Sequence, residues 1–252
     1  MLDEHLTGRP TRIRFRLDDV HGDLGVEKGI SVLVTSVQEL TAAAESEWLE
    51  KWTEGPTEVG LRCLDAGESA PSPVLLDETG TARVLSEFWA DGPALLMFRR
   101  HFGCFCGLGR AARLREEWSR YRDAGLHPVI VGQGEPGRAA AYRADQELPS
   151  PILCDPDHDV YRAFGVGHWQ VERALYASPP EYWDHPRELG VSFQTERRAI
   201  GRPPVDDPWR AFAEFVVGMD GKVRLPYAYQ YCDDFPPPEL LMASAGLSAP
   251  RR

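Results

Sequence analysis

The pattern of apolar and polar residues divides the chain into two parts. From residue 59 onward, short apolar runs bounded by turn residues alternate with stretches in which apolar residues recur every three or four positions. The short runs are typical of strands that are buried on both faces, and the longer stretches are typical of amphipathic helices. This alternation predicts an α/β fold, in which helices cover both faces of a parallel or mixed sheet.

The elements of the second part can be placed by residue number. An Asp-Gly pair between two apolar runs is a strong hairpin signal, and it predicts a hairpin near the end of the chain. The first of the buried strands, over 94–98, is followed in the sequence by the first of the helices, over 107–121. Strands are expected over 94–98, 127–132, 150–153, 214–217 and 222–231, and helices over 107–121, 136–146, 159–164 and 238–245.

Residues 1–58 are expected to form an N-terminal appendage with the order strand, strand, helix. Alternating apolar and polar residues predict a strand over 11–17, and a run of strand-forming residues predicts a second strand over 29–35. A capping box at Ser36 predicts the start of the helix. The remaining residues, 59–252, are assigned to one domain.

Residues 167–207 break the alternation within this domain. They hold several prolines among Trp and Tyr residues, which predicts a loop-rich insertion. Long loops often form lids or partner surfaces.

Charge and composition narrow the function. The 252 residues carry a net charge of -11, which disfavours contacts with nucleic acid or with an anionic membrane. No apolar run approaches the roughly 20 residues that a bilayer span needs, and the first residues lack a signal-peptide pattern. A cytoplasmic protein is expected. Arg greatly outnumbers Lys and Ala is abundant, which is typical of a GC-rich bacterium.

Five cysteines are an odd number in a chain that is long enough to build a core without disulfides. Cys63 and Cys154 are expected to be small buried apolar residues. Cys104 and Cys106 instead stand where the strand over 94–98 ends and a helix begins. The free N–H groups of a helix start stabilise a thiolate and lower the pKa of a Cys from about 8.5.

Three residues before this pair add to the same effect. Arg99, Arg100 and His101 are expected to contribute positive potential to the site. A thiolate is the species that attacks peroxides and disulfides. The alternative, in which both cysteines are buried and inert, remains open.

Four motifs, in order, resemble those of the AhpC/TSA peroxiredoxin-like proteins. Residues 67–77 are similar to that family's first strand and turn, and residues 93–104 to its central strand and active-site Cys. Residues 154–165 are similar to its D-P-D and Y-x-x-F/L-G segment, and residues 215–223 to its last hairpin. The resemblance implies a thioredoxin-like mixed sheet flanked by helices. The nearest subgroup is the one with an R-H-F-G-C-x-x-C motif.

The chain departs from that motif in ways that affect chemistry. Cys104 falls on the subgroup's first Cys, whereas Gly107 takes the place of the second and Cys106 stands one residue early. A disulfide between Cys104 and Cys106 would demand a distorted backbone, because positions i and i+2 of a helix point about 200° apart. His101 replaces the hydroxyl residue that orients a peroxide, and the usual Pro before the last hairpin is missing. These departures predict slow peroxidase activity.

The resemblance implies a thiol-dependent oxidoreductase that reduces peroxides or disulfides. Cys104 attacks the substrate, Arg100 and His101 stabilise the thiolate and donate protons, and Cys106 or an external thiol resolves the product. Cys232 is either a resolving thiol or a free thiol at an edge. The expected partners are a small peroxide or disulfide and a thioredoxin-like or low-molecular-weight thiol reductant. No cofactor is expected, and homodimerisation is left open.

Two other functions compete with this one. His101, Cys104 and Cys106 offer soft ligands for Cu(I) or zinc, although a fourth ligand is not evident. A non-redox scaffold or a tailoring protein of secondary metabolism would instead use the insertion over 167–207 as its pocket.

Overall fold

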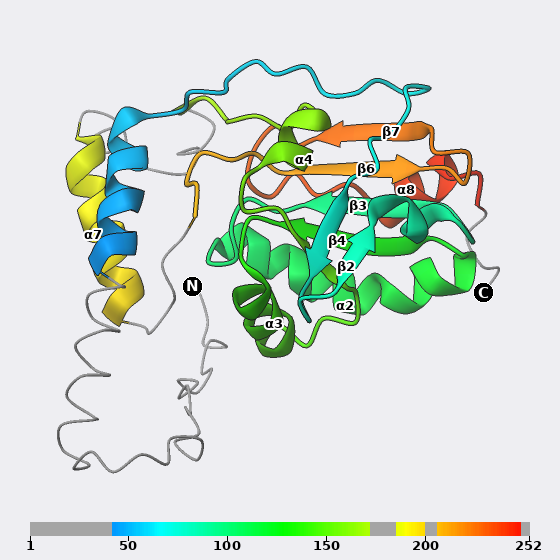
Figure 1. Cartoon of the computed structure of the whole chain (residues 1–252), viewed down its shortest axis with the longest axis horizontal. Coiled ribbons are helices and arrows are strands. Elements are labelled where there is room, and N and C mark those ends of the chain that lie inside the picture. The colour runs from blue at the N-terminus through cyan, green and yellow to red at the C-terminus, as the bar shows by residue number, and fades with distance from the viewer. Residues whose placement is uncertain (1–41, 172–184, 200–205, 248–252) are drawn as a thin grey trace, which may run out of the picture.

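The computed structural model describes residues 42–171, 185–199 and 206–247 (Figure 1). The strands expected over 11–17 and 29–35 lie outside these residues. The described strands form one seven-stranded mixed sheet with the order β2-β1-β5-β4-β3-β6-β7. They are β1 (Val74–Asp77), β2 (Ala82–Val84), β3 (Ala94–Phe98), β4 (His127–Gly132), β5 (Ile152–Cys154), β6 (Ala213–Val217) and β7 (Val223–Ala228).

Helices flank this sheet, as the sequence predicts. β3, β4 and β5 run parallel, whereas β6 pairs antiparallel with β3. The α/β class is therefore confirmed. The helices are α2 (Phe105–Ala124), α3 (Pro136–Asp145), α4 (Asp159–Ala163), α7 (Pro186–Ala199) and α8 (Pro238–Ser244), with a 3-10 helix η1 (Leu85–Trp89) and a further helix over 42–54.

The start of α2 is earlier than the expected residue 107. Gly107 and Gly109 are poor helix formers, so they conceal the first turn from an analysis of propensity. The strands β3 and β4 lie where they were expected. Within the described residues, no helix is long and apolar enough to cross a membrane.

The central strand β3 is buried along its whole length and separates two cores. Leu96 and Phe98 face one core, which α4 and η1 cover, and Leu95 and Met97 face the other, which α2, α3 and α8 cover. Successive residues of a strand point to opposite faces, so a strand in the middle of a covered sheet must be apolar throughout. This requirement explains the continuous apolar sequence before the cysteines.

A buried ion pair joins α2 to β6. The guanidinium of Arg110, which is fully buried, donates to both carboxylate oxygens of Glu214 at 2.7 and 3.1 Å and to Glu117 at 2.9 Å. The hydroxyl of Tyr229 donates to the same Glu214 at 2.6 Å. These bonds fix the first half of α2 against the sheet.

Within the segment 167–207, which was expected to be rich in loops, residues 186–199 form the helix α7. Its inward face holds Gly190, Gln194 and Arg197 beside the apolar Leu189 and Phe193. A face that is partly polar gives little hydrophobic periodicity, so the pattern of apolar residues did not reveal the helix.

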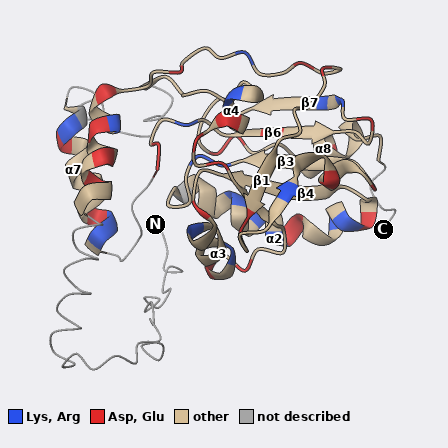
Figure 2. Cartoon of the chain, in the orientation of Figure 1, with Lys and Arg blue, Asp and Glu red and all other residues tan. Residues whose placement is uncertain are grey.

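The helix over 42–54 agrees with the helix expected in the appendage, and it lies beside α7 (Figure 1). Trp48 stacks on Trp52 and on Phe193, and Trp52 stacks on Trp209, with ring centroids 5.2, 5.5 and 4.7 Å apart. Both helices carry charges of both signs along their surfaces (Figure 2), and Arg198 pairs with Glu45. The boundary at residue 58 stays a prediction.

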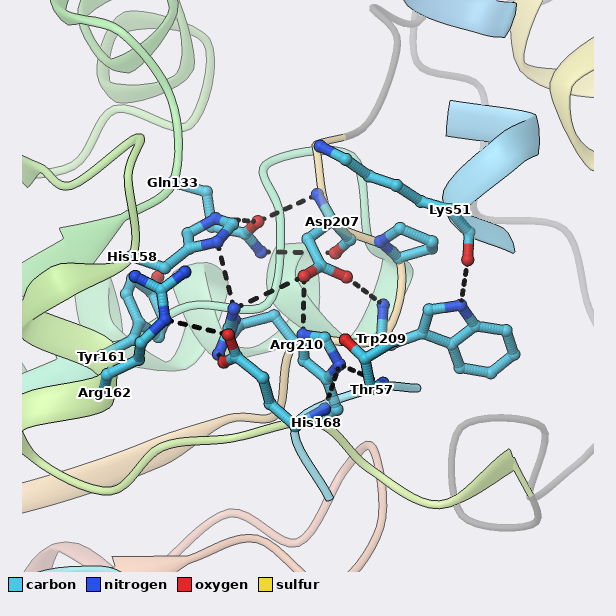
Figure 3. Close-up of polar contacts among 12 residues, drawn as sticks. Lys51, Thr57, Gln133, His158, Tyr161, Arg162, His168, Asp207, Trp209 and Arg210 are labelled. Atoms are coloured by element: carbon cyan, nitrogen blue, oxygen red, sulfur yellow. Dashed lines mark hydrogen bonds and ion pairs between the residues drawn. The ribbon is translucent and has the colours of Figure 1, made fainter. Parts of the chain in front are cut away.

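A buried polar network holds the segment before β6 in place (Figure 3). The Nε2 atom of His168 donates to Asp207 Oδ2 at 2.7 Å, and its Nδ1 atom accepts the backbone N–H groups of Thr57 and Glu58 at 3.0 and 3.1 Å. The other carboxylate oxygen of Asp207 accepts the backbone N–H of Trp209 at 2.9 Å. Residues far apart in the chain therefore meet at Asp207.

Arg210 extends this network on its other side. Its guanidinium donates to Glu58 at 2.7 Å and to Nδ1 of His158 at 3.0 Å. His158 in turn donates from Nε2 to the Gln133 side-chain oxygen at 2.9 Å, which also accepts the backbone N–H of Asp207. Arg210 must donate, so His158 is the neutral tautomer with its proton on Nε2.

We predict that this network makes the fold sensitive to acid. Partial burial raises the pKa of Glu58, but hydrogen bonds from Arg162 and Arg210 outweigh it and lower the pKa to about 2. Against burial, the bond to His168 lowers the pKa of Asp207 as well. Both pKa values lie below those of unfolded carboxyls, about 4, so this stability is present at neutral pH and is lost as the pH falls from about 5 toward 2. Urea unfolding at a series of pH values measures the loss.

Glu58→Gln should be less stable than the wild type at pH 7. On acidification from pH 7, its free energy of unfolding should fall by less than that of the wild type. Glu116→Gln, at an exposed position of α2, is the matched control and should follow the wild type. An acid dependence of Glu58→Gln equal to that of the wild type would contradict this account.

A second prediction concerns the buried ion pair. Glu214→Ala leaves the charge of Arg110 buried without its bidentate partner, and we expect a loss of about 3–5 kcal/mol in the free energy of unfolding. Asp220→Asn breaks an exposed ion pair with Arg224 and should cost less than about 1 kcal/mol. Denaturant titration of both variants measures the two losses. Equal losses would show that burial of the ion pair does not determine its contribution to stability.

Candidate functional site

Cys104 stands at the junction that the sequence predicts. It is the N-cap of α2, with an extended backbone conformation of φ -72° and ψ 133°. It lies in the loop that leads from β3 to α2. Its carbonyl accepts the N–H of Leu108 at 3.0 Å, which closes the first helical turn. Cys104 is only 6% exposed. The thiol is therefore largely shielded from water and lies at the N-terminus of a long helix, where the helix dipole is positive.

Arg100 supplies a buried positive charge next to this thiol. Its Nη1 atom lies 3.9 Å from the Cys104 sulfur and 3.8 Å from the Cys232 sulfur. Its Nε and Nη2 atoms donate to the carbonyl of Pro208 at 2.9 and 2.5 Å, and the guanidinium lies 5.5 Å from the ring centroid of Trp169. The Pro208 carbonyl belongs to the segment that the Asp207 network holds.

Three thiols meet at this charge. Hydrogen bonds from Cys106 and Cys232, together with the charge of Arg100, outweigh desolvation and hold the pKa of Cys104 well below its usual value. The same bond to Cys104 raises the pKa of Cys232 to about 11, and bonds to both neighbours raise the pKa of Cys106 further. Of the three thiols, Cys104 is therefore the one whose surroundings most favour the thiolate.

His101 does not provide the positive charge expected of it. It is buried, and desolvation together with Arg100 and Arg197 lowers its pKa to about 3 although Cys104 acts in the opposite direction. At neutral pH the imidazole is uncharged, and its Nδ1 atom has no hydrogen-bond partner among the described residues. The expectation from sequence is corrected because burial removes the charge.

Arg99 and Arg197 act on the backbone around the cysteines. Arg99 donates to the carbonyl of Gly107 in the first turn of α2. Arg197 of α7 donates to the carbonyl of Gly103 at 2.6 Å, and a Cβ atom at Gly103 would overlap its guanidinium. Gly at this position therefore permits α7 to reach the cysteine loop.

Aromatic side chains enclose Cys104. Trp169, Phe212 and Tyr229 pack with it in one buried cluster, in which Phe212 stacks on Tyr229 with centroids 5.2 Å apart. The same three residues are among those that line a cleft of about 240 Å³, together with parts of the segments 59–63 and 165–170.

Cys154 is buried as expected, whereas Cys63 is only partly buried and its thiol donates to the carbonyl of Gly165 at 3.3 Å. Burial raises the pKa of Cys63, and it raises the pKa of Cys154 to about 12. All five cysteines are free thiols. Among the described residues, no group of three His, Cys, Asp or Glu side chains is arranged to hold a metal ion, so the geometry gives no support to a site made by His101, Cys104 and Cys106.

Sequence reasoning missed several residues of this site. Arg197 belongs to the segment that was expected to be loop-rich, and Pro208 follows directly after it, more than a hundred residues from Cys104. Trp169 is also in the segment 167–207, where aromatic residues among prolines were the one feature of the sequence that could have indicated a functional role. No spacing rule connects any of them with the cysteine pair.

Comparison with known proteins agrees with the family that the motifs resemble. Residues 66–181 match the AhpC/TSA family. The thioredoxin-like protein AAED1, chloroplastic, of Arabidopsis thaliana is 32% identical over 89 residues. That match covers 35% of this chain and 36% of the relative, so it spans about a third of the relative's length.

Solved structures share the fold. Peroxidoxin BcpB from Mycobacterium tuberculosis superposes with a TM-score of 0.53 at 17% identity, over 73% of this chain and 97% of that chain. A mutant of PrxQ from Xylella fastidiosa gives a TM-score of 0.50 at 10% identity, over 73% and 95%. The R-H-F-G-C-x-x-C subgroup stays a prediction. The resemblance to the wider family is confirmed over residues 66–181, which match the AhpC/TSA family, and the described sheet shares the fold of these peroxiredoxin structures.

Proposed function

We propose that the protein is a thiol-dependent oxidoreductase in which Cys104 attacks a disulfide or a peroxide. The observation that carries the proposal is the Cys104 sulfur at the start of α2, 3.9 Å from the buried guanidinium of Arg100. A helix N-terminus and a fixed cation both favour a thiolate over a thiol. The family and the fold support thiol-based redox chemistry in general.

With a disulfide substrate, the Cys104 thiolate attacks one sulfur and the other leaves as a thiolate. The new mixed disulfide is then cleaved by a second thiol, which returns Cys104 to its reduced form. With a peroxide, a sulfur–oxygen bond forms as the oxygen–oxygen bond breaks, and the leaving oxygen takes a proton from water. Cys104 becomes a sulfenic acid, which an external thiol reduces in two steps.

The surroundings of Cys104 favour the disulfide reaction. Arg100 is the group placed to stabilise charge on a departing atom, because it is held by Pro208 and points at the sulfur. A peroxide also needs a group that orients the oxygen–oxygen bond. His101 stands where the family has a hydroxyl residue, and it is buried and neutral.

We predict that Cys104 remains reactive at pH values where ordinary thiols are protonated. Its lowered pKa means that the thiolate persists well below the usual midpoint of about 8.5. The rate of alkylation by iodoacetamide, followed by peptide mass spectrometry from pH 5 to 10, gives the midpoint. Arg100→Gln should raise that midpoint, and Arg224→Gln, in an exposed ion pair, should leave it unchanged.

The internal reference for this experiment is Cys63, whose pKa is raised by burial. A midpoint for Cys104 at or above that of Cys63 would overturn its assignment as the nucleophile.

We also predict that hydrogen peroxide oxidises Cys104 slowly. Each missing donor in such a reaction typically costs about 100-fold in rate, so the rate constant should be at least that much below the rate constant of a dedicated peroxidase measured in parallel. An aromatic disulfide reagent lacks this geometric demand and should react readily. Stopped-flow measurements with both oxidants test the difference, and Cys104→Ser should leave only the slower reaction of the remaining free thiols. Oxidation by peroxide as fast as in the dedicated enzyme would show that another group orients it.

A further inference from the structure

We propose that Cys232 is the resolving thiol and that it forms a disulfide with Cys104 within one chain. This inference rests on the proposed function, because it concerns the fate of Cys104 once that residue has been oxidised. It names a reaction product and a catalytic residue that the cysteine pair in the sequence does not indicate.

The first support is geometric. One nitrogen atom of Arg100 contacts both sulfurs, at 3.9 Å for Cys104 and 3.8 Å for Cys232. Both cysteines belong to one cluster with Phe212 and Tyr229. The two thiols, which lie far apart in the sequence, therefore contact the same nitrogen atom in the folded protein.

Cys232 also lies in a turn that presents it to the site. Asp234, two residues later, accepts the hydroxyl of Tyr227 at 2.8 Å and the backbone N–H of Gln230 at 2.9 Å. These bonds hold the turn after β7, while Cys232 itself remains partly exposed. A short turn outside the sheet can shift by the small amount that a new sulfur–sulfur bond requires.

Cys106 is a poorer partner although it is nearer in sequence. It belongs to the first turn of α2, which the bond from Leu108 to the Cys104 carbonyl closes. A disulfide between residues two apart would force that turn out of helical geometry and store strain. Cys106 instead donates a hydrogen bond that stabilises the Cys104 thiolate.

The chemistry of the second step is consistent with this assignment. The thiolate of Cys104 is the main cause of the raised pKa of Cys232. When peroxide converts Cys104 into a sulfenic acid, that negative charge disappears while Arg100 stays next to Cys232. The proton of Cys232 then leaves more readily, to water, and its sulfur attacks the sulfur of Cys104.

The step balances. A sulfur–sulfur bond forms, the sulfur–oxygen bond of the sulfenic acid breaks, and the leaving hydroxide takes a proton to become water. One peroxide gains two electrons, and two thiols lose them. An external dithiol then restores both cysteines.

Peptide mapping separates the two candidate disulfides. Trypsin releases residues 101–110, which hold Cys104 and Cys106, and residues 225–251, which hold Cys232. A disulfide between Cys104 and Cys232 joins these peptides, whereas one between Cys104 and Cys106 leaves the first peptide alone and lighter by two hydrogen atoms. The full chain is treated with hydrogen peroxide, blocked with iodoacetamide, and digested without reductant.

We expect the joined peptides in the wild type, in Cys106→Ser and in the matched control Cys63→Ser. They should be lost in Cys104→Ser and in Cys232→Ser. Cys232→Ser should also accumulate a sulfenic acid on Cys104, which dimedone traps, at the expense of the disulfide.

Other outcomes overturn the inference. Joined peptides that persist in Cys104→Ser would assign the bond to Cys106, and a cross-link that runs as a dimer on a non-reducing gel would place it between chains. A lighter 101–110 peptide in the wild type would make Cys106 the resolving thiol. Dimedone labelling of Cys104 with no disulfide in the wild type would reject Cys232 while keeping the proposed function, whereas an unreactive Cys104 would reject the proposed function itself.

Discussion

The site depends on a single constraint: a buried guanidinium must keep its hydrogen bonds. Arg100 meets this requirement through the carbonyl of Pro208, which accepts two of its N–H groups. Desolvating a charge is costly unless it is paired, so the position of that carbonyl determines the position of the charge. The carbonyl lies between Asp207 and Trp209, which the network of His168, Gln133 and Arg210 holds (Figure 3).

One fixed cation among three thiols also explains why the thiols differ. Cys104 stands at the helix start and accepts hydrogen bonds from the other two, so it becomes the thiolate. Cys106 and Cys232 serve as donors, and their pKa values rise in consequence. Chemically identical side chains thus differ in the pKa that their surroundings give them, which is the basis for the different roles proposed for them.

The parts of the chain outside the central sheet contribute to this arrangement. The helix over 42–54 packs on α7 through stacked tryptophans, and α7 sends Arg197 to the carbonyl of Gly103, next to Cys104. Glu58 joins the network around Arg210. The segment that looked like an insertion and the end of the appendage therefore both reach the cysteine loop, one directly and one through Asp207.

The sequence by itself determined the strand over 94–98, the helix start after it and Cys104 as the residue between them, because strand burial and helix periodicity are local patterns. The family motifs are local as well. Only the tertiary structure decided that Cys232 meets Cys104, that Pro208 holds Arg100 and that α7 is a helix with a polar inner face. It also decided that His101 is neutral, since the charge of a titratable group depends on how deeply the fold buries it. Contacts between residues a hundred positions apart leave no signal in spacing, and burial exists only once the chain has folded.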